Sequence, residues 1–201
     1  MARGLSSIYP RRVRHERLTA FPPIAAPDAR VLVLGSMPSQ ASLAAGQYYA
    51  HPRNAFWPIM GALLGFDPSL PYGRRAGLLA AAGIALWDVA KSCVRPGSLD
   101  AAIRHVEAND FAGFFAAHPR IGCIFFNGAT AERLFLRLAL PALEAPWRSL
   151  PRRRLPSTSP AHAALSFEQK LAAWQAVRQA LESPPARPHR ATENIHQEKT
   201  A

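Results

Sequence analysis

The sequence contains few cysteines and no long hydrophobic run. Cys93 and Cys123 are the only two thiols, so the chain cannot supply the four thiolates of an iron–sulfur cluster or a cysteine-rich zinc site. We expect both thiols to be buried and reduced. The longest apolar run covers twelve residues, 76–87, and includes two glycines, whereas a membrane-spanning helix needs about twenty apolar residues. Residues 1–30 lack the apolar segment of a secretory signal, so we expect a cytoplasmic protein that does not enter a membrane.

Acidic residues are scarce compared with basic ones. The chain has 24 Lys and Arg against 13 Asp and Glu, a formal net charge of +11. Residues 148–154 contain four arginines and no acid. A basic surplus suits a polyanion, because neutralised phosphates release counterions. Arginine- and alanine-rich chains are also basic for compositional reasons, so charge alone leaves nucleic-acid binding open.

The two ends of the chain differ from its middle. Residues 1–17 are basic and lack periodicity, which indicates an N-terminal arm. Residues 183–201 are rich in proline and charge, which predicts a disordered tail. The 201 residues contain no internal repeat, and residues 18–182 are long enough for one domain with its own core.

Short apolar runs alternate with helical patterns within that domain. Strands are expected at residues 31–34, 84–87, 121–126 and 153–155, and helices at residues 56–64, 74–82, 129–140 and 167–181, with a further helix containing Phe111, Phe114 and Phe115 and capped by Asn109 or Asp110. Ser166 and Gln169 have the spacing of a capping box for the last helix. The alternation predicts a three-layer α/β/α sandwich around a four-stranded parallel sheet. Ligands of such sheets bind outside the carboxyl ends of the strands, so we expect the site in the loops that follow them.

The loop after the first expected strand is unusually aromatic. Residues 46–57 read GQYYAHPRNAFW, a composition suited to holding a planar ring, as an everted nucleobase is held by stacking and by hydrogen bonds to its edge. A structural interpretation stands beside this one. Phe56 and Trp57 could begin a core helix, with Asn54 as its N-cap and the two tyrosines packed beneath the loop.

Four segments, in order, resemble the hypoxanthine-DNA glycosylase branch (family 6) of the uracil-DNA glycosylase superfamily. They are VLGSMPS followed by YYAHPRNAFW, then GIALWDV, IFFNG and LPSTSPA, and the resemblance extends over about residues 18–181. It implies an α/β/α sandwich that takes part in base excision repair and excises deaminated bases from DNA without a metal or cofactor. Four ordered motifs are far more specific than a single glycine signature.

The resemblance also assigns functional residues. The asparagine that the family ties to catalysis falls on Asn54, the asparagine implicated in the base pocket falls on Asn127, and LPSTSPA falls on the DNA-engaging loop. The chain departs from other branches in lacking an Asp or Asn directly after Gly35, where those branches keep a water-activating residue. It also has Leu155 where uracil-specific enzymes have a histidine. Removal of uracil from every context is therefore not expected.

The chemistry of glycosidic cleavage supports these assignments. The transition state places positive charge on the sugar and negative charge on the leaving base, and preorganised amide groups can stabilise both in a dry pocket. We therefore predict that Asn54 positions the water, Asn127 recognises the base and Tyr49 stacks on it. Further predicted base-binding residues are Gly35, Ser36, Met37, Pro38, His51 and Phe56, and the predicted DNA-binding residues are Arg53, Ser157, Thr158, Ser159 and His162.

Several residues keep two interpretations. His51 could donate to a purine or be a loop histidine bound to backbone. Asp88, at the end of the second strand, could act in the site or only bind the neighbouring loop. Lys91, Glu107 and Lys170 are expected at the surface.

The function predicted is that of a monomeric, monofunctional DNA glycosylase for hypoxanthine. A mismatch-specific uracil or thymine glycosylase and a catalytically silent nucleic-acid binding module remain as alternatives. A nucleotide-binding domain is excluded, because the GSMP turn lacks the glycines of a phosphate loop and Pro38 removes a donor N–H. The site motifs contain no lysine, so we expect no Schiff-base lyase step.

Overall fold

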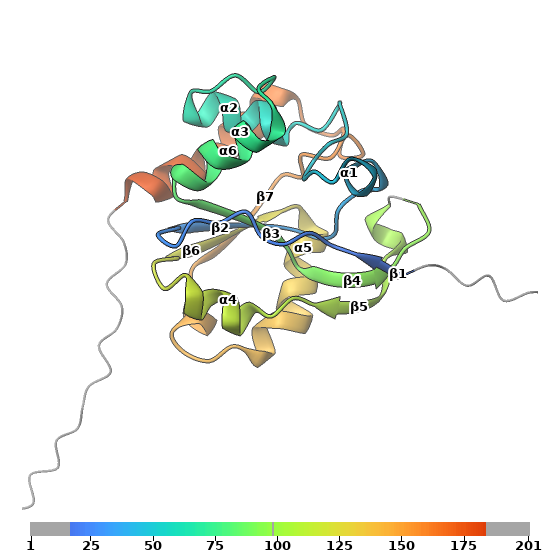
Figure 1. The fold of residues 1–201 in the computed structure, drawn as a ribbon, viewed down its shortest axis with the longest axis vertical. Helices are drawn as coiled ribbons and strands as arrows, with labels where there is room; N and C mark the ends of the chain where they lie inside the picture. Colours follow the sequence, from blue (N-terminus) through green and yellow to red (C-terminus); the bar gives the residue numbers. More distant parts are fainter. Residues whose placement is uncertain (1–16, 98, 184–201) are drawn as a thin grey trace, which may run out of the picture.

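The computed structural model describes residues 17–97 and 99–183 of the chain (Figure 1). The predicted arm and tail therefore lie outside the described residues, apart from Arg17, which begins a strand, and Ser183, which follows the last helix. None of the helices in the described ranges has the length and apolar character needed to cross a membrane.

A four-stranded parallel sheet forms the centre of the fold. Its strand order is β3-β2-β6-β7, with β2 at Val31–Gly35, β3 at Ile84–Asp88, β6 at Cys123–Asn127 and β7 at Arg152–Leu155. Every residue of β2 and β3 is buried, as expected for parallel strands covered on both faces. The register pairs Gly35 with Asp88 and Asn127 with Leu155. The last residues of four strands thus meet at one edge, and the predicted sheet is confirmed.

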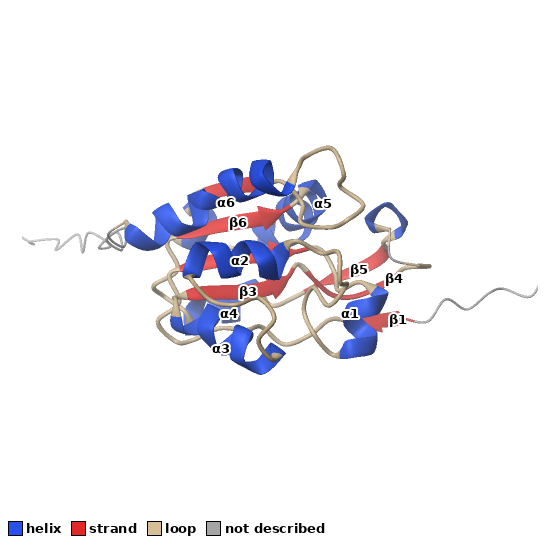
Figure 2. Cartoon of the chain, turned by 90° about the horizontal axis from the view of Figure 1, so that it is seen from above, coloured by secondary structure: helices blue, strands red, loops and turns tan. Residues whose placement is uncertain are grey.

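Helices cover both faces of the sheet, which confirms the α/β/α sandwich (Figures 1 and 2). One layer contains α2 (Phe56–Leu64), α3 (Tyr72–Ala81) and α6 (Phe167–Glu182). The other contains α4 (Phe111–Ala117) and α5 (Ala129–Leu134). The alternation of side chains along β2 divides the core, because Val31 and Val33 pack toward the first layer and Leu32 and Leu34 toward the second.

Helix ends follow the predicted capping residues. Asp110 accepts a hydrogen bond from the Gly113 N–H at the start of α4, and Ser166 with Gln169 forms the capping box of α6. The helix expected at residues 129–140 is not a continuous α-helix. It changes to a π-helix at Phe135–Ala139 and to a 3-10 turn at Leu140–Ala142, where Pro141 lacks an N–H and disfavours α conformation in the residue before it.

A second sheet and a short helix were not predicted. The sheet is antiparallel, with order β1-β4-β5, and consists of β1 (Arg17–Thr19), β4 (Ala90–Val94) and β5 (Arg104–Ala108). The short helix is α1 (Gln40–Ala45), capped by Ser39 and ended by Gly46 in the left-handed conformation. Strand β4 begins two residues after β3 ends, and α1 lies in the loop after β2, so both elements stand at the carboxyl edge of the parallel sheet (Figure 1).

Candidate active site

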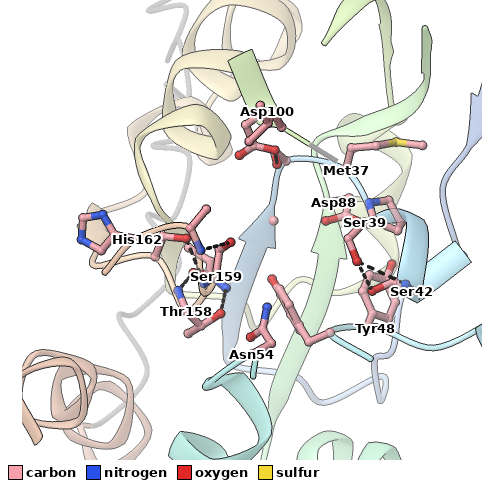
Figure 3. Close-up of a pocket in the computed structure, with 18 of the residues that line it drawn as sticks. Met37, Ser39, Ser42, Tyr48, Asn54, Asp88, Asp100, Thr158, Ser159 and His162 are labelled. Carbon is pink, nitrogen blue, oxygen red and sulfur yellow. Dashed lines mark hydrogen bonds between the residues drawn. The ribbon is translucent and has the colours of Figure 1, made fainter. Parts of the chain in front are cut away.

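A cavity of about 240 Å³ opens at the carboxyl edge of the parallel sheet. Its size is below the roughly 300–1,000 Å³ of sites for drug-sized ligands, so it suits a single small planar molecule. Figure 3 shows that its side chains come from the loops after β2, β3, β6 and β7. The lining residues are Gly35, Ser36, Met37, Pro38, Ser39, Ser42, Tyr48, Tyr49, Asn54, Asp88, Arg95, Leu99, Asp100, Asn127, Ser157, Thr158, Ser159, Ala161 and His162.

Most of the predicted site residues line this cavity, and three do not. Phe56 is fully buried in the core beneath the cavity. His51 lies outside the lining, and its Nδ1 accepts a hydrogen bond from the Arg53 N–H at 3.1 Å. This contact matches the alternative interpretation of His51 as a loop histidine bound to backbone. Arg53 is exposed and also lies outside the lining.

Asn54 is held in place by backbone contacts at the start of α2. Its Oδ1 accepts from the Phe56 N–H at 3.0 Å, and its own N–H donates to the His51 carbonyl at 2.8 Å. The formal N-cap is Ala55, which has no side-chain acceptor, so Asn54 provides the cap from one residue earlier. Because the cap uses one lone pair of Oδ1, the second lone pair and both Nδ2–H groups stay available to the cavity.

The Asn127 carboxamide binds the neighbouring loop. Its Nδ2 donates to Thr158 Oγ1 and its Oδ1 accepts from the Thr158 N–H, both at 2.8 Å. Thr158 is 1% exposed, and its carbonyl accepts from the Ala55 N–H at 3.0 Å. Asn127 therefore joins the end of β6 to the 157–159 loop and, through it, to α2. The structure gives Asn127 a positioning role that the sequence did not predict.

The tyrosine loop is rigid and supported from below. The Tyr49 ring stacks on Phe56 with centroids 4.2 Å apart and planes 26° from parallel. Tyr49 has a φ of 55°, a left-handed conformation that costs a non-glycine residue about 1–2 kcal/mol. Neighbouring contacts hold it there, since Trp57 Nε1 donates to the Tyr48 carbonyl at 2.9 Å and the Ala50 N–H donates to Ser42 Oγ at 3.2 Å. An aromatic surface fixed in this way suits the stacking of a planar ligand.

Gly35, Asp88 and Tyr49 meet at the floor of the cavity. A Cβ on Gly35 would overlap Asp88 Oδ1 and lie 2.9 Å from the Tyr49 hydroxyl, so only glycine fits between them. Asp88 Oδ2 and the Tyr49 hydroxyl are both buried and have no hydrogen-bond partner among the described residues. The Asn127 amide lies near that hydroxyl but is turned toward Thr158.

Burial dominates the electrostatics of this floor. It raises the pKa of Asp88 to about 8, with the Asp100 charge adding to the shift and Arg95 opposing it. Burial and the Asp88 charge likewise raise the pKa of Tyr49. A strongly perturbed carboxyl group in a polar cavity is a common feature of functional sites.

Arg95 and Asp100 form a wall that the sequence analysis missed. Arg95 is 4% exposed, donates from Nη2 to the Pro38 carbonyl and donates from Nε to the Gly97 carbonyl at 3.0 Å. Asp100 Oδ1 accepts from Ser36 Oγ at 2.9 Å. The signal that could have found them is the Pro96-Gly97 turn directly after the Ser92-Cys93-Val94 run, which marks the end of a strand beside the site.

The 157–162 loop is tied to α6 at the opposite wall. The His162 N–H donates to the Ser159 carbonyl at 3.0 Å, and Lys170 Nζ donates to the His162 carbonyl at 2.7 Å. The prediction of Lys170 as a surface residue is wrong, because it is 6% exposed and anchors this loop. In Figure 3 the His162 ring lies on the outer side of the loop, away from Asp88.

Within residues 17–97 and 99–183, no group of three or more His, Cys, Asp or Glu side chains is placed to hold a metal ion. The polar groups of the cavity are amides, hydroxyls, carboxyls and one guanidinium. These groups can form hydrogen bonds to a base and orient a water molecule.

Comparison with known proteins links this site to a family. The family model of the uracil DNA glycosylase superfamily matches residues 22–181. Two curated relatives from Methanosarcina barkeri and Methanosarcina acetivorans, both named hypoxanthine DNA glycosylase, are 38% identical over 109 and 112 residues, which cover 54% and 55% of this chain and 69% and 71% of theirs. A solution NMR structure of a candidate uracil DNA glycosylase from M. acetivorans has a TM-score of 0.69 and 32% sequence identity, covering 84% of this chain and 100% of its own. The resemblance seen in four sequence segments is thereby confirmed, and the chain belongs to the uracil DNA glycosylase superfamily.

Proposed function

We propose that this protein is a monofunctional DNA glycosylase that everts a deaminated base from DNA and excises it by hydrolysis, with hypoxanthine as the preferred base. Membership of the superfamily and the names of the two curated relatives support the activity and the base. The observation that carries the proposal is the placement of Asn54. Its carboxamide is fixed by the Phe56 N–H, keeps its Nδ2–H groups unspent, and faces a cavity of base size beside the stacked Tyr49 ring.

The base would enter above Gly35 and lie against Tyr49, which Phe56 supports from the core. Stacking on a rigid ring offsets part of the cost of removing the base from the DNA stack. Since Gly35 has no side chain, the base can approach the end of β2 closely. The everted nucleotide would thus present its glycosidic bond near the cavity mouth.

Asn54 would act on the bond that breaks. The second lone pair of its Oδ1 can accept a hydrogen bond from the attacking water, and its Nδ2–H groups can donate to the water or the departing base. Water adds to the sugar carbon as the glycosidic bond breaks, and the electron pair of that bond leaves with the base. A fixed dipole at this point stabilises the developing charges without reorganising during the reaction.

The 157–159 loop and β7 would contact the DNA backbone. Hydroxyl and N–H groups of Ser157, Thr158 and Ser159 are types that commonly bind phosphate oxygens. Arg152, Arg153 and Arg154 are exposed along β7, and Arg154 forms an exposed ion pair with Glu132 at 3.2 Å. Phosphate contacts of this kind position DNA without reading its sequence.

Base release from duplexes that carry hypoxanthine, uracil, xanthine or thymine opposite each partner base tests the proposal. We expect strong release of hypoxanthine and weak release of uracil. Strong release of uracil or thymine from mismatches, with little hypoxanthine, would favour a mismatch-specific enzyme instead. Tight binding of every duplex with no abasic product would leave a catalytically silent binding module.

A further inference from the structure

The hydrogen bonds within the cavity show which polar groups remain for a ligand. Asn127 spends both ends of its carboxamide on Thr158. Ser36 Oγ donates to Asp100, and Arg95 binds two carbonyls of its own wall. Three groups remain along the inner surface: the Asn54 amide nitrogen, the Tyr49 hydroxyl and Asp88 Oδ2, the last two buried without a partner among the described residues.

Asp88 is held rigidly through its backbone while its side chain is left unpaired. Its carbonyl accepts from Asn109 Nδ2 at 2.8 Å, and it pairs with Gly35 in the sheet register. The next residue, Val89, donates its N–H to the Gly35 carbonyl at 2.9 Å. Asp88 is 3% exposed, and a buried carboxyl oxygen without a partner destabilises a fold. A rigid backbone with an unsatisfied side chain indicates that the missing partner is a ligand of the cavity.

The chemistry of deamination identifies the group that would pair with it. In adenine, a ring nitrogen with a lone pair lies beside an amino group, so the edge offers an acceptor and then a donor. Deamination turns this edge into a ring N–H beside a carbonyl, which reverses both positions. A carboxylate has acceptors only, so it binds the ring N–H of the deaminated base and repels the lone pair of the parent base.

We propose that Asp88 is a specificity-determining residue, whose carboxyl oxygen at the cavity floor accepts a hydrogen bond from the ring N–H of the everted base. This inference rests on the proposed function. Asn54 Nδ2 and the Tyr49 hydroxyl are the two remaining donors and would bind the adjacent carbonyl of the base. Specificity therefore comes from the end of β3 rather than from Asn127, whose carboxamide positions the 157–159 loop.

The protonation state of Asp88 gives the inference a distinct signature. The charged and titratable groups around the carboxyl are Asp100, Arg95, Tyr48 and Tyr49. When protonated, Asp88 can also donate and so can pair with the edge of adenine, whereas the ionised form cannot. Discrimination between the two bases should thus rise with pH as Asp88 ionises.

The test uses the full-length protein and two duplexes whose 2′-fluoro sugars resist cleavage, one with deoxyinosine and one with deoxyadenosine. Dissociation constants are measured by fluorescence anisotropy between pH 6 and pH 8.5. Asp88→Asn is the test variant, because its amide has a donor and an acceptor and can pair with either edge. Asp28→Asn is the matched control, since Asp28 is exposed and lies before the amino end of β2, at the opposite end of the sheet.

We expect Asp88→Asn to reduce the inosine-to-adenosine affinity ratio by about tenfold at pH 8, the loss of one charge-assisted hydrogen bond, and to abolish the rise of that ratio with pH. Asp28→Asn should keep the wild-type ratio and its pH dependence. If Asp88→Asn does not fold, Asp88→Ser replaces it with the same expectation. An unchanged ratio, or equal weakening of both duplexes, would overturn the role of Asp88. If the wild-type protein released no deaminated base from cleavable duplexes, the proposed function itself would fail.

Discussion

Asp88→Asn should make the protein more stable near neutral pH while it impairs base recognition. The wild-type carboxyl group has a pKa of about 8 in the fold, against about 3.9 for an unperturbed aspartate. The folded state therefore holds the proton more tightly than the unfolded state does. Stability from this group is fully present below about pH 4 and is lost as the pH rises toward 8, because the unfolded chain gains by releasing its proton.

The size of the effect follows from the two pKa values. At pH 7 the unfolded carboxyl is about three pKa units above its midpoint, and each unit corresponds to about 1.4 kcal/mol, which sets an upper limit of about 4 kcal/mol. An asparagine does not titrate but leaves its own amide in need of partners, which offsets part of this gain. We expect a net gain of about 2 kcal/mol at pH 7, or roughly 4–8 °C in Tm.

Thermal unfolding of the wild type, Asp88→Asn and Asp28→Asn from pH 4.5 to pH 8.5 measures the effect. The Tm difference between Asp88→Asn and the wild type should be small near pH 4.5 and grow steadily with pH, while Asp28→Asn follows the wild type. An Asp88→Asn variant that is less stable than the wild type at every pH would show that the carboxyl group has a structural partner, and the reasoning about an unspent acceptor would be refuted.

Three further substitutions test other parts of the site. Asn54→Ala should lower single-turnover excision of hypoxanthine by about 10²–10³-fold with unchanged DNA affinity; Asn54→Asp keeps the α2 cap but lacks the amide donors, so equal excision by Asn54→Asp and the wild type would remove those donors from the mechanism. Gly35→Ala should abolish most excision, because its Cβ overlaps Asp88 Oδ1, whereas Gly77→Ala, on the exposed face of α3 where an added Cβ meets nothing, should keep full activity and gain up to about 1 kcal/mol in unfolding free energy; equal activity of the two variants would contradict the close packing at the floor. Asn127→Ala should cost about 2 kcal/mol in urea unfolding, since it leaves the Thr158 N–H and hydroxyl unpaired, and should weaken binding to duplex DNA; an unchanged unfolding midpoint would exclude the positioning role of Asn127.

The central sheet and its helices could be predicted because their signals are local. The continuous apolar run of β2 marks a strand buried on both faces, and the Ser166–Gln169 capping box fixes the start of α6 without reference to the rest of the chain. The antiparallel sheet could not be found in this way. Strand β4 includes an exposed Lys91 and strand β5 includes Arg104, His105 and Glu107, and these polar segments become strands only because they pair with each other and with β1.

The site divides along the same line. Sequence motifs identified the loops that carry Tyr49, Asn54 and Asn127, and all three residues line the cavity. The direction in which an amide points is not a property of its motif. Asn127 turns to Thr158 because the two lie across the β6–β7 edge of a folded sheet, a relation between positions 31 residues apart in the chain. Once that bond is formed, the unpaired acceptor of the cavity is the carboxyl group on the neighbouring strand pair. The tertiary hydrogen bonds thus decide which polar residue of a recognisable motif remains available to the base, and Asp88 acquires its importance through what Asn127 has already bound.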